Sequence, residues 1–188
     1  QKGPDLVVVP PKYPLYLRFS ALTRKIYEDY SEFIEPFGLD ECWLDVTGSE
    51  KSGEEIAHEI RKRVKSQLGI TVSIGVSFNK VFAKLGSDLK KPDAVTVISP
   101  ENFKEKIYPL PAGDLLFVGK STADKLKKIN VLTIGDLALL NEDYLLKKFG
   151  KAGRTLRTYA LGEDDSPVLK DEQGEEIKSV GNSMTSYR

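Results

Sequence analysis

The sequence predicts an α+β fold, in which an antiparallel or mixed sheet carries helices packed on one face and is followed by a small all-helical part. Two observations predict it. Helical and strand patterns alternate from about residue 5 to residue 107, as they do where helices cover a sheet. Beyond the prolines at 109 and 111, only short helical patterns follow, at about 114–117, 121–128, 133–140, 142–148 and 151–161.

The elements of the first part begin and end at recognisable signals. Pro14 suits the first turn of a helix that runs to about residue 31. Ser52 and Glu55 form a capping box that starts another helix, which runs to about residue 67. The remaining predictions are strands at 5–9, 70–76 and 95–98, a hairpin over 35–47, and helices at 78–89 and 100–107.

Two adjacent carboxylates, Asp40 and Glu41, stand at the predicted turn of the hairpin, shortly after Gly38. Adjacent carboxylates repel each other unless a cation neutralises them. Mg²⁺ and Mn²⁺ take such hard oxygen ligands, together with water and phosphate oxygens. An Asp-Glu pair at a turn is more often simply solvated. The metal-binding interpretation therefore depends on the motifs in the rest of the chain.

A basic helix and the lysine that follows it are candidates for contacts with phosphate. Lys80 and Lys84 lie one helical turn apart and therefore share a face of the helix. Lys91 precedes Pro92, and its ammonium can present a point charge to a triphosphate. A solvated basic helix face explains the same pattern equally well.

The charges are unevenly distributed although the formal net charge is zero. Residues 1–60 carry 6 basic and 12 acidic side chains, residues 61–160 carry 19 and 9, and the last 28 residues carry 3 and 7. The middle of the chain therefore suits a polyanion, while the carboxylates of the first part suit metal ions. Chance clustering on solvated helices is the alternative.

The composition argues against several classes of protein. No apolar run reaches membrane-spanning length and no signal-peptide pattern is present, so we expect a soluble, cytoplasmic protein with no membrane partner. The single cysteine, Cys42, excludes an internal disulfide, and with a single histidine, His58, the sequence argues against a structural zinc site. The chain starts at Gln1 and its one methionine is Met184, so we expect a fragment of a longer protein.

The helical part contains a pattern for binding DNA phosphates. Gly119, Lys120 and Ser121 stand at the start of a predicted helix, and Gly135 follows in the next one. This order looks like a helix–hairpin–helix element, in which backbone amides at a helix start hold a phosphate without reading bases. The candidate DNA contacts are therefore Lys80, Lys84, Gly119, Lys120, Ser121 and Gly135.

Several motifs, in the same order along the chain, resemble those of the Y-family (translesion) DNA polymerases, bacterial DNA polymerase IV and its relatives. Residues 39–47 resemble the family's Ser-Ile-Asp-Glu-x-x-Leu-Asp-Val-Thr segment. Residues 75–85, followed by Lys91-Pro92, resemble its Gly-x-Ser-x-Asn-Lys-x-x-Ala-Lys segment and the Lys-Pro after it. Residues 9–13, 149–168 and 179–183 resemble the approach to the catalytic hairpin, the end of the thumb domain and the first strand of the little finger.

The resemblance implies template-directed nucleotidyl transfer past damaged bases, with two Mg²⁺ ions or Mn²⁺ in their place. It implies that Asp40 bridges the metals, that Glu41 holds the metal at the primer 3′ oxygen, and that Lys91 contacts the nucleotide's phosphates. Asp45 is expected to be structural. The implied partners are primer–template DNA, a deoxynucleoside triphosphate and, through regions absent from this sequence, a sliding clamp.

The resemblance also implies three parts, which are a partial palm at 1–111, a helical thumb at 112–166, and a linker with the start of a little finger at 167–188. The family's first strand, with its remaining metal-binding Asp, and most of the fingers domain have no counterpart, so we expect this fragment to be inactive as a polymerase. Two rival functions stay open: a non-catalytic helix–hairpin–helix DNA-binding module and an unrelated palm-like nucleotidyl cyclase.

The chain departs from the family pattern at three places. Gly38-Leu39 replaces Ser-Ile before the carboxylates, residues 119–121 replace Gly-Ile-Gly, and residues 129–131 replace Leu-Gly-Ile. The loss of the two hairpin glycines predicts a less close approach of the backbone to a phosphate. Lys120 offsets this electrostatically, which predicts DNA binding with a stronger dependence on salt.

Overall fold

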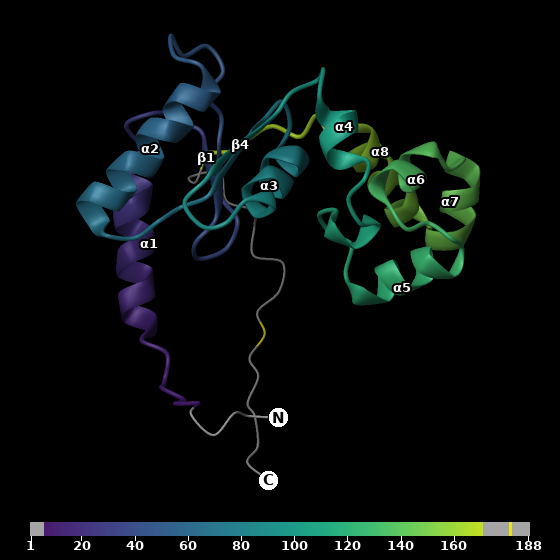
Figure 1. The fold of residues 1–188 in the computed structure, drawn as a ribbon, viewed down its shortest axis with the longest axis horizontal. Helices are drawn as coiled ribbons and strands as arrows, with labels where there is room; N and C mark the ends of the chain where they lie inside the picture. Colours follow the sequence, from purple (N-terminus) through teal and green to yellow (C-terminus); the bar gives the residue numbers. More distant parts are fainter. Residues whose placement is uncertain (1–5, 171–180, 182–188) are drawn as a thin grey trace.

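A computed structural model describes residues 6–170 and 181 of the chain. In Figure 1, α1 and α2 lie at one end, the strands lie between them and α3, and the later helices gather at the other end. The elements, in order, are α1 (Tyr13–Tyr27), β1 (Ile34–Pro36), β2 (Cys42–Leu44), α2 (Gly53–Leu68), β3 (Ile74–Ser77), α3 (Lys80–Leu89), β4 (Val95–Ile98), α4 (Phe103–Ile107), η1 (Ala112–Asp114), α5 (Lys120–Lys128), α6 (Ile134–Leu139), α7 (Glu142–Phe149) and α8 (Lys151–Leu161). The predicted α+β class is confirmed, and none of these helices is long and apolar enough to cross a bilayer.

The strands of the described residues form two separate sheets of two strands each. β1 and β2 are antiparallel, as the predicted hairpin requires, with Glu35 opposite Trp43. The Phe37 amide closes the hairpin by donating to the Glu41 carbonyl at 2.8 Å, and Gly38 takes a φ of 92° in the turn, which glycine adopts without strain. β3 and β4 are parallel neighbours.

Helices cover both faces of the sheet formed by β3 and β4. Successive side chains of a strand point to opposite faces. Ile74 packs in one hydrophobic cluster with Ile56 and Ile60 of α2. Gly75 faces α3 instead, where an added Cβ would lie 1.9 Å from the carbonyl oxygen of Ala83. The expected packing on one face therefore describes α1 and α2, whereas α3 reaches the other face because Gly75 has no side chain.

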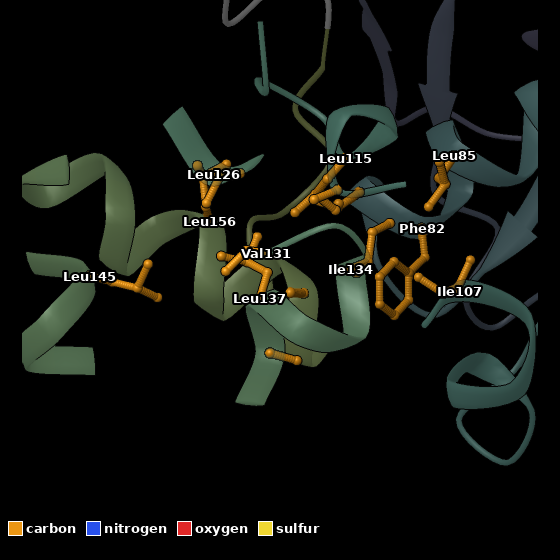
Figure 2. Close-up of a cluster of buried hydrophobic side chains, with 14 of the residues drawn as sticks. Phe82, Leu85, Ile107, Leu115, Leu126, Val131, Ile134, Leu137, Leu145 and Leu156 are labelled. Carbon is orange, nitrogen blue, oxygen red and sulfur yellow. The ribbon is translucent and has the colours of Figure 1, made fainter. Parts of the chain in front are cut away.

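The larger hydrophobic core joins the sheet part to the helical part. Phe82 of α3, Ile107 of α4 and Ile134 of α6 are fully buried members of one cluster, and Figure 2 shows them near one another, with Leu126 and Leu145 of the later helices further along. The cluster is continuous past the prolines at 109 and 111. A domain boundary at that point stays a prediction.

Several predicted strands are shorter in the structure or absent from it. Residues 6–9 form no strand and are exposed. The pairing of β2 with β1 ends at Leu44, although the strand pattern covers 42–47. The pairing of β3 with β4 starts at Ile74, although the strand pattern covers 70–76. A β-prone segment becomes a strand only where a partner satisfies its backbone groups, and these residues have no partner strand in the described part of the chain. The predicted helix at 114–117 is a 3₁₀ turn at Ala112–Asp114. The predicted strand at 179–183 and most of the linker lie outside the described residues.

The turn between α5 and α6 adopts a left-handed conformation without a glycine. Asn130 has a φ of 59°, and asparagine tolerates this region better than other residues with a side chain. The Val131 amide then donates to the Leu126 carbonyl at 3.0 Å, and Thr133 starts α6 with a capping box shared with Asp136. The hairpin therefore forms although asparagine stands where the family pattern has glycine.

We expect Asn130→Ala to lower the free energy of unfolding by about 1 kcal/mol, because alanine is strained in the left-handed region. Asn130→Gly is the matched comparison and should leave stability unchanged within about 0.5 kcal/mol. Urea denaturation of the 188-residue chain, followed by circular dichroism, measures both. Equal losses in the two variants would mean that the Asn130 side chain, rather than its backbone conformation, stabilises the turn.

Candidate functional site

Asp40 and Glu41 lie in the turn between β1 and β2, on the wall of a cavity of about 750 Å³. Asp40 is exposed and Glu41 is half-buried. The same cavity is lined by Lys84 of α3 and by Lys91, which follows that helix. The structure therefore brings together four of the residues that the sequence singled out, from three segments of the chain.

A row of alternating charges connects Glu41 to Lys91. The Nζ atom of Lys84 lies 3.2 Å from Oε1 of Glu41 and 2.5 Å from Oδ2 of Asp88, and Nζ of Lys91 lies 2.7 Å from Oδ1 of Asp88. The side chain of Lys84 is 17% exposed and that of Lys91 is 56% exposed. Asp88 was not predicted, although its spacing of four and three residues from the two lysines is a signal that the sequence contains.

The two central members of this row keep each other charged. Burial would lower the pKa of Lys84, but its hydrogen bonds to Asp88 and Glu41 outweigh burial, so the pKa is raised. Burial would raise the pKa of Asp88, but the hydrogen bonds from Lys84 and Lys91 prevail and lower it. The two shifts favour the ammonium form of Lys84 and the carboxylate form of Asp88.

Lys80 shares a helix with Lys84 but points into a different environment. Its Nζ lies 2.6 Å from Oε1 of Glu35 and 4.7 Å from the centre of the Trp43 ring, and the side chain is 14% exposed. It also donates to the Pro167 carbonyl at 3.3 Å, and the Leu169 amide donates to the same Glu35 carboxylate at 2.9 Å. This placement favours a structural role for Lys80, which ties β1 to the segment after α8, over the predicted contact with DNA.

The predicted DNA contacts of the helical part separate into two groups. Gly119, Lys120 and Ser121 are exposed at the start of α5, where no side chain caps the helix and the first-turn amides have no acceptor within the helix. Gly135 is buried, and its amide donates to the Tyr108 carbonyl at 3.0 Å. Its lack of a side chain lets α6 approach Tyr108, so this placement favours a packing role for Gly135.

The two carboxylates supply the kind of ligand atom that a hard divalent cation binds, but two carboxylates are too few to complete its site. Asp40 and Glu41 offer oxygen ligands of the kind that Mg²⁺ and Mn²⁺ bind. Across residues 6–170 and 181, no group of three or more His, Cys, Asp or Glu side chains is placed to hold a metal ion. Asp45 does not join them, because its Oδ1 accepts from the Thr47 amide at 2.8 Å, and hydrogen bonds from the Thr47 side chain and backbone lower its pKa.

Comparison with known proteins finds relatives that match most or all of this chain. Residues 1–88 match the impB/mucB/samB family. The chain is 55% identical over 190 residues to the DNA polymerase IV of Acetivibrio thermocellus, a match that spans 100% of this chain and 48% of that relative. The crystal structure of DinB from Sulfolobus solfataricus is 28% identical with a TM-score of 0.80, covering 89% of this chain and 50% of that one.

A second solved structure, described as an insertion ternary complex of Dbh DNA polymerase, has a TM-score of 0.79 and 28% identity, covering 88% of this chain and 49% of that one. The matches to DNA polymerase IV and to the two solved structures extend over the helical part as well as the sheet part, whereas the family match ends at residue 88. The chain spans about half the length of the relatives it matches.

Proposed function

We propose, from the similarity of the chain to DNA polymerase IV proteins, that it contributes the carboxylate pair and part of the DNA-binding surface of a translesion DNA polymerase of the Y-family. The observation that carries the proposal is that carboxylates and lysines lie together on the wall of the cavity. There, Asp40 and Glu41 lie on the same wall as Lys84 and Lys91, and Asp88 pairs with both lysines. A DNA-binding module alone has no use for this arrangement.

Each member of the site has a role suited to its exposure. Asp40 and Glu41 would hold divalent cations, for which Mg²⁺ is the first candidate and Mn²⁺ the second. A bound metal would stabilise the charge that develops on the reacting phosphate. Lys84 holds Glu41 in place, and the more exposed Lys91 offers its ammonium to the triphosphate of the incoming deoxynucleotide.

The start of α5 is the proposed contact with primer–template DNA. The amides that follow Gly119 carry the partial positive charge of a helix start, to which Lys120 adds a full charge. A second helix, α8, begins in the same way, with Gly150 and Lys151 and without a side-chain cap. In contrast, Thr133 and Asn141 cap α6 and α7. Such contacts hold the DNA backbone and do not read its sequence.

The experiment that tests the proposal is primer extension by a chimera in which this chain replaces the matched segment of the Acetivibrio thermocellus enzyme. We expect the chimera to extend a primer when Mg²⁺ is present. We expect the 188-residue chain alone to give no extension, because two carboxylates do not complete a metal site. A folded chimera without activity would contradict the proposed function. Robust extension by the 188-residue chain alone would contradict the expectation that its metal site is incomplete.

The rival interpretations explain less. A helix–hairpin–helix module accounts for Lys120 and its neighbours but leaves the carboxylate row without a role. A palm-like nucleotidyl cyclase accounts for the carboxylates but not for the helical part, which lies within the same polymerase matches. The chimera separates them, since neither a DNA-binding module nor a cyclase supports extension of a primer.

Lys120→Ala should weaken the binding of primer–template DNA by the chimera and flatten its dependence on salt. The expected change in the slope of log K against log[salt] is about 1, because one lysine–phosphate contact releases about one counterion. Fluorescence anisotropy between roughly 50 and 200 mM salt measures it. Lys62→Ala, which removes an exposed lysine from α2, is the matched control, and an equal change in both variants would mean that net charge alone governs binding.

A further inference from the structure

Lys91 lies in a short loop between α3 and β4. The loop comprises residues 90–94, and residues 91–93 line the cavity. The ion pair between Lys91 and Asp88 joins two side chains, so it orients the ammonium but does not fix the backbone of the loop. The place from which Lys91 reaches into the cavity therefore depends on what anchors the loop further along.

Asp93 provides this anchor through two basic side chains of α2. Its carbonyl oxygen accepts a hydrogen bond from Nη1 of Arg61 at 2.9 Å, and the same Nη1 atom lies 3.1 Å from Oδ1 of Asp93. Nζ of Lys65, one helical turn after Arg61, lies 2.6 Å from the other carboxylate oxygen, Oδ2. One loop residue is thus held by its backbone and by both oxygens of its side chain.

The backbone of Asp93 has a conformation that glycine adopts more readily. Its φ of 56° lies in the left-handed region, where aspartate is tolerated but glycine carries no strain. The carboxylate gives a reason for a side chain at this position, because each of its oxygens has a cationic partner and the side chain is only 17% exposed. The carboxylate of Asp93 is therefore part of the anchor.

Arg61 is the more important of the two basic partners. Its side chain is 26% exposed, against 61% for Lys65, and exposed ion pairs contribute little to stability. In the described part of the chain, the guanidinium of Arg61 makes hydrogen bonds and ion pairs with Asp93 alone. The helix behind it is held firmly, because Ile60 and Val64 are buried in one cluster. Arg61 therefore connects a packed helix to the loop of Lys91.

We propose that Arg61 is a positioning residue for nucleotide binding, because through Asp93 it fixes the loop from which Lys91 reaches the triphosphate. The inference rests on the proposed function of Lys91 and adds a residue that acts through the loop rather than by touching the nucleotide. A loop that is already held in place loses less conformational freedom when the nucleotide binds, so the anchor raises the affinity.

The first test measures how single-turnover primer extension by the chimera depends on nucleotide concentration. We expect Arg61→Ala to raise the apparent Kd of the nucleotide about tenfold and to change the maximal rate less than about threefold, because the loop serves binding. Both contacts of Arg61 use one nitrogen, so Arg61→Lys should recover most of the affinity. Arg63→Ala is the matched control, because Arg63 also lies on α2 but pairs with Asp29.

A double-mutant cycle with Lys91 separates positioning from a general structural role. In a Lys91→Ala background, Arg61→Ala should change the apparent Kd by less than about twofold, because the residue through which it acts is already gone. An equal loss of affinity in both backgrounds would overturn the proposal, as would an equal loss in Arg63→Ala. If Arg61→Ala does not fold, Asp93→Gly takes its place, since glycine keeps the backbone conformation and removes the carboxylate.

A second measurement needs no activity and separates this inference from the proposed function. Backbone order parameters from NMR relaxation report the motion of residues 90, 91 and 93 in the 188-residue chain. We expect about 0.85 in the wild-type chain and in Arg63→Ala, and less than about 0.6 in Arg61→Ala. Unchanged order parameters in Arg61→Ala would overturn the positioning role even if the chimera is active. A loop that loosens in Arg61→Ala, together with an inactive wild-type chimera, would support the anchor but overturn its role in nucleotide binding.

Discussion

Replacing both site carboxylates, by Asp40→Asn and Glu41→Gln, is expected to lower the rate of primer extension by the chimera by a factor on the order of 10² or more. Amides have nearly the shape of the carboxylates but lack the charge that holds a divalent cation. The rate is measured in single-turnover primer extension with Mg²⁺ at saturating nucleotide. The affinity for primer–template DNA, measured without nucleotide, should change little, because the proposed DNA-binding residues lie on α5.

Asp45→Asn is the matched control for this pair. Asp45 lies in the same hairpin, but its carboxylate accepts a hydrogen bond from the Thr47 amide, which marks it as structural. The extension rate of this variant should stay within about tenfold of the wild-type rate. If the Asp40 and Glu41 variants are also within that range, the carboxylate pair is not the metal site and the proposed mechanism is wrong.

Gly75→Ala should destabilise the chain by at least about 3 kcal/mol, the upper range for overpacking a core. The added methyl group would meet the backbone of α3, with the Ala83 carbonyl oxygen at 1.9 Å and the Ser87 nitrogen at 2.6 Å. A backbone cannot rotate out of the way as a flexible side chain can, so α3 would have to move away from β3. Urea denaturation of the 188-residue chain measures the loss.

Gly119→Ala provides the comparison for this prediction. Gly119 has no heavy atom within 4 Å of the position that its Cβ would take, and its φ of −74° is ordinary for any residue. The free energy of unfolding should therefore fall by less than about 1 kcal/mol. Similar losses in both variants would show that the contact between β3 and α3 is not the reason for the glycine at position 75.

Local signals in the sequence determined most of the helices and the hairpin. The capping box of Ser52 and Glu55 is present at the start of α2, and the turn with Gly38 forms as predicted. These features depend on residues within a few positions of one another, so the local sequence carries them. The adjacency of Asp40 and Glu41 was likewise a property of the sequence, and so was the family resemblance.

Tertiary structure decided which lysines belong to the site. Lys80 and Lys84 share a helix face in the sequence, yet Lys80 is paired with Glu35 and Lys84 with Glu41. The difference arises because α3 crosses the end of the hairpin, which places a different carboxylate beside each turn of the helix. No local pattern contains that crossing. Asp88 had a local signal in its spacing from Lys84 and Lys91, but only the fold joins these residues to Glu41.

Tertiary structure also decided how far the strands extend and which glycines serve packing. The sequence determines that residues 70–76 are suited to a strand, but pairing depends on a partner that is distant in the chain or outside it. Gly135 resembled a phosphate-binding glycine, but its contact is with Tyr108 at the end of α4, and both η1 and α5 lie between the two residues in the chain. The sequence by itself determined most of the local elements and the resemblance to a family. The contacts between elements that are distant in sequence decided the roles of individual residues, because burial and hydrogen-bond partners arise only when the chain is folded.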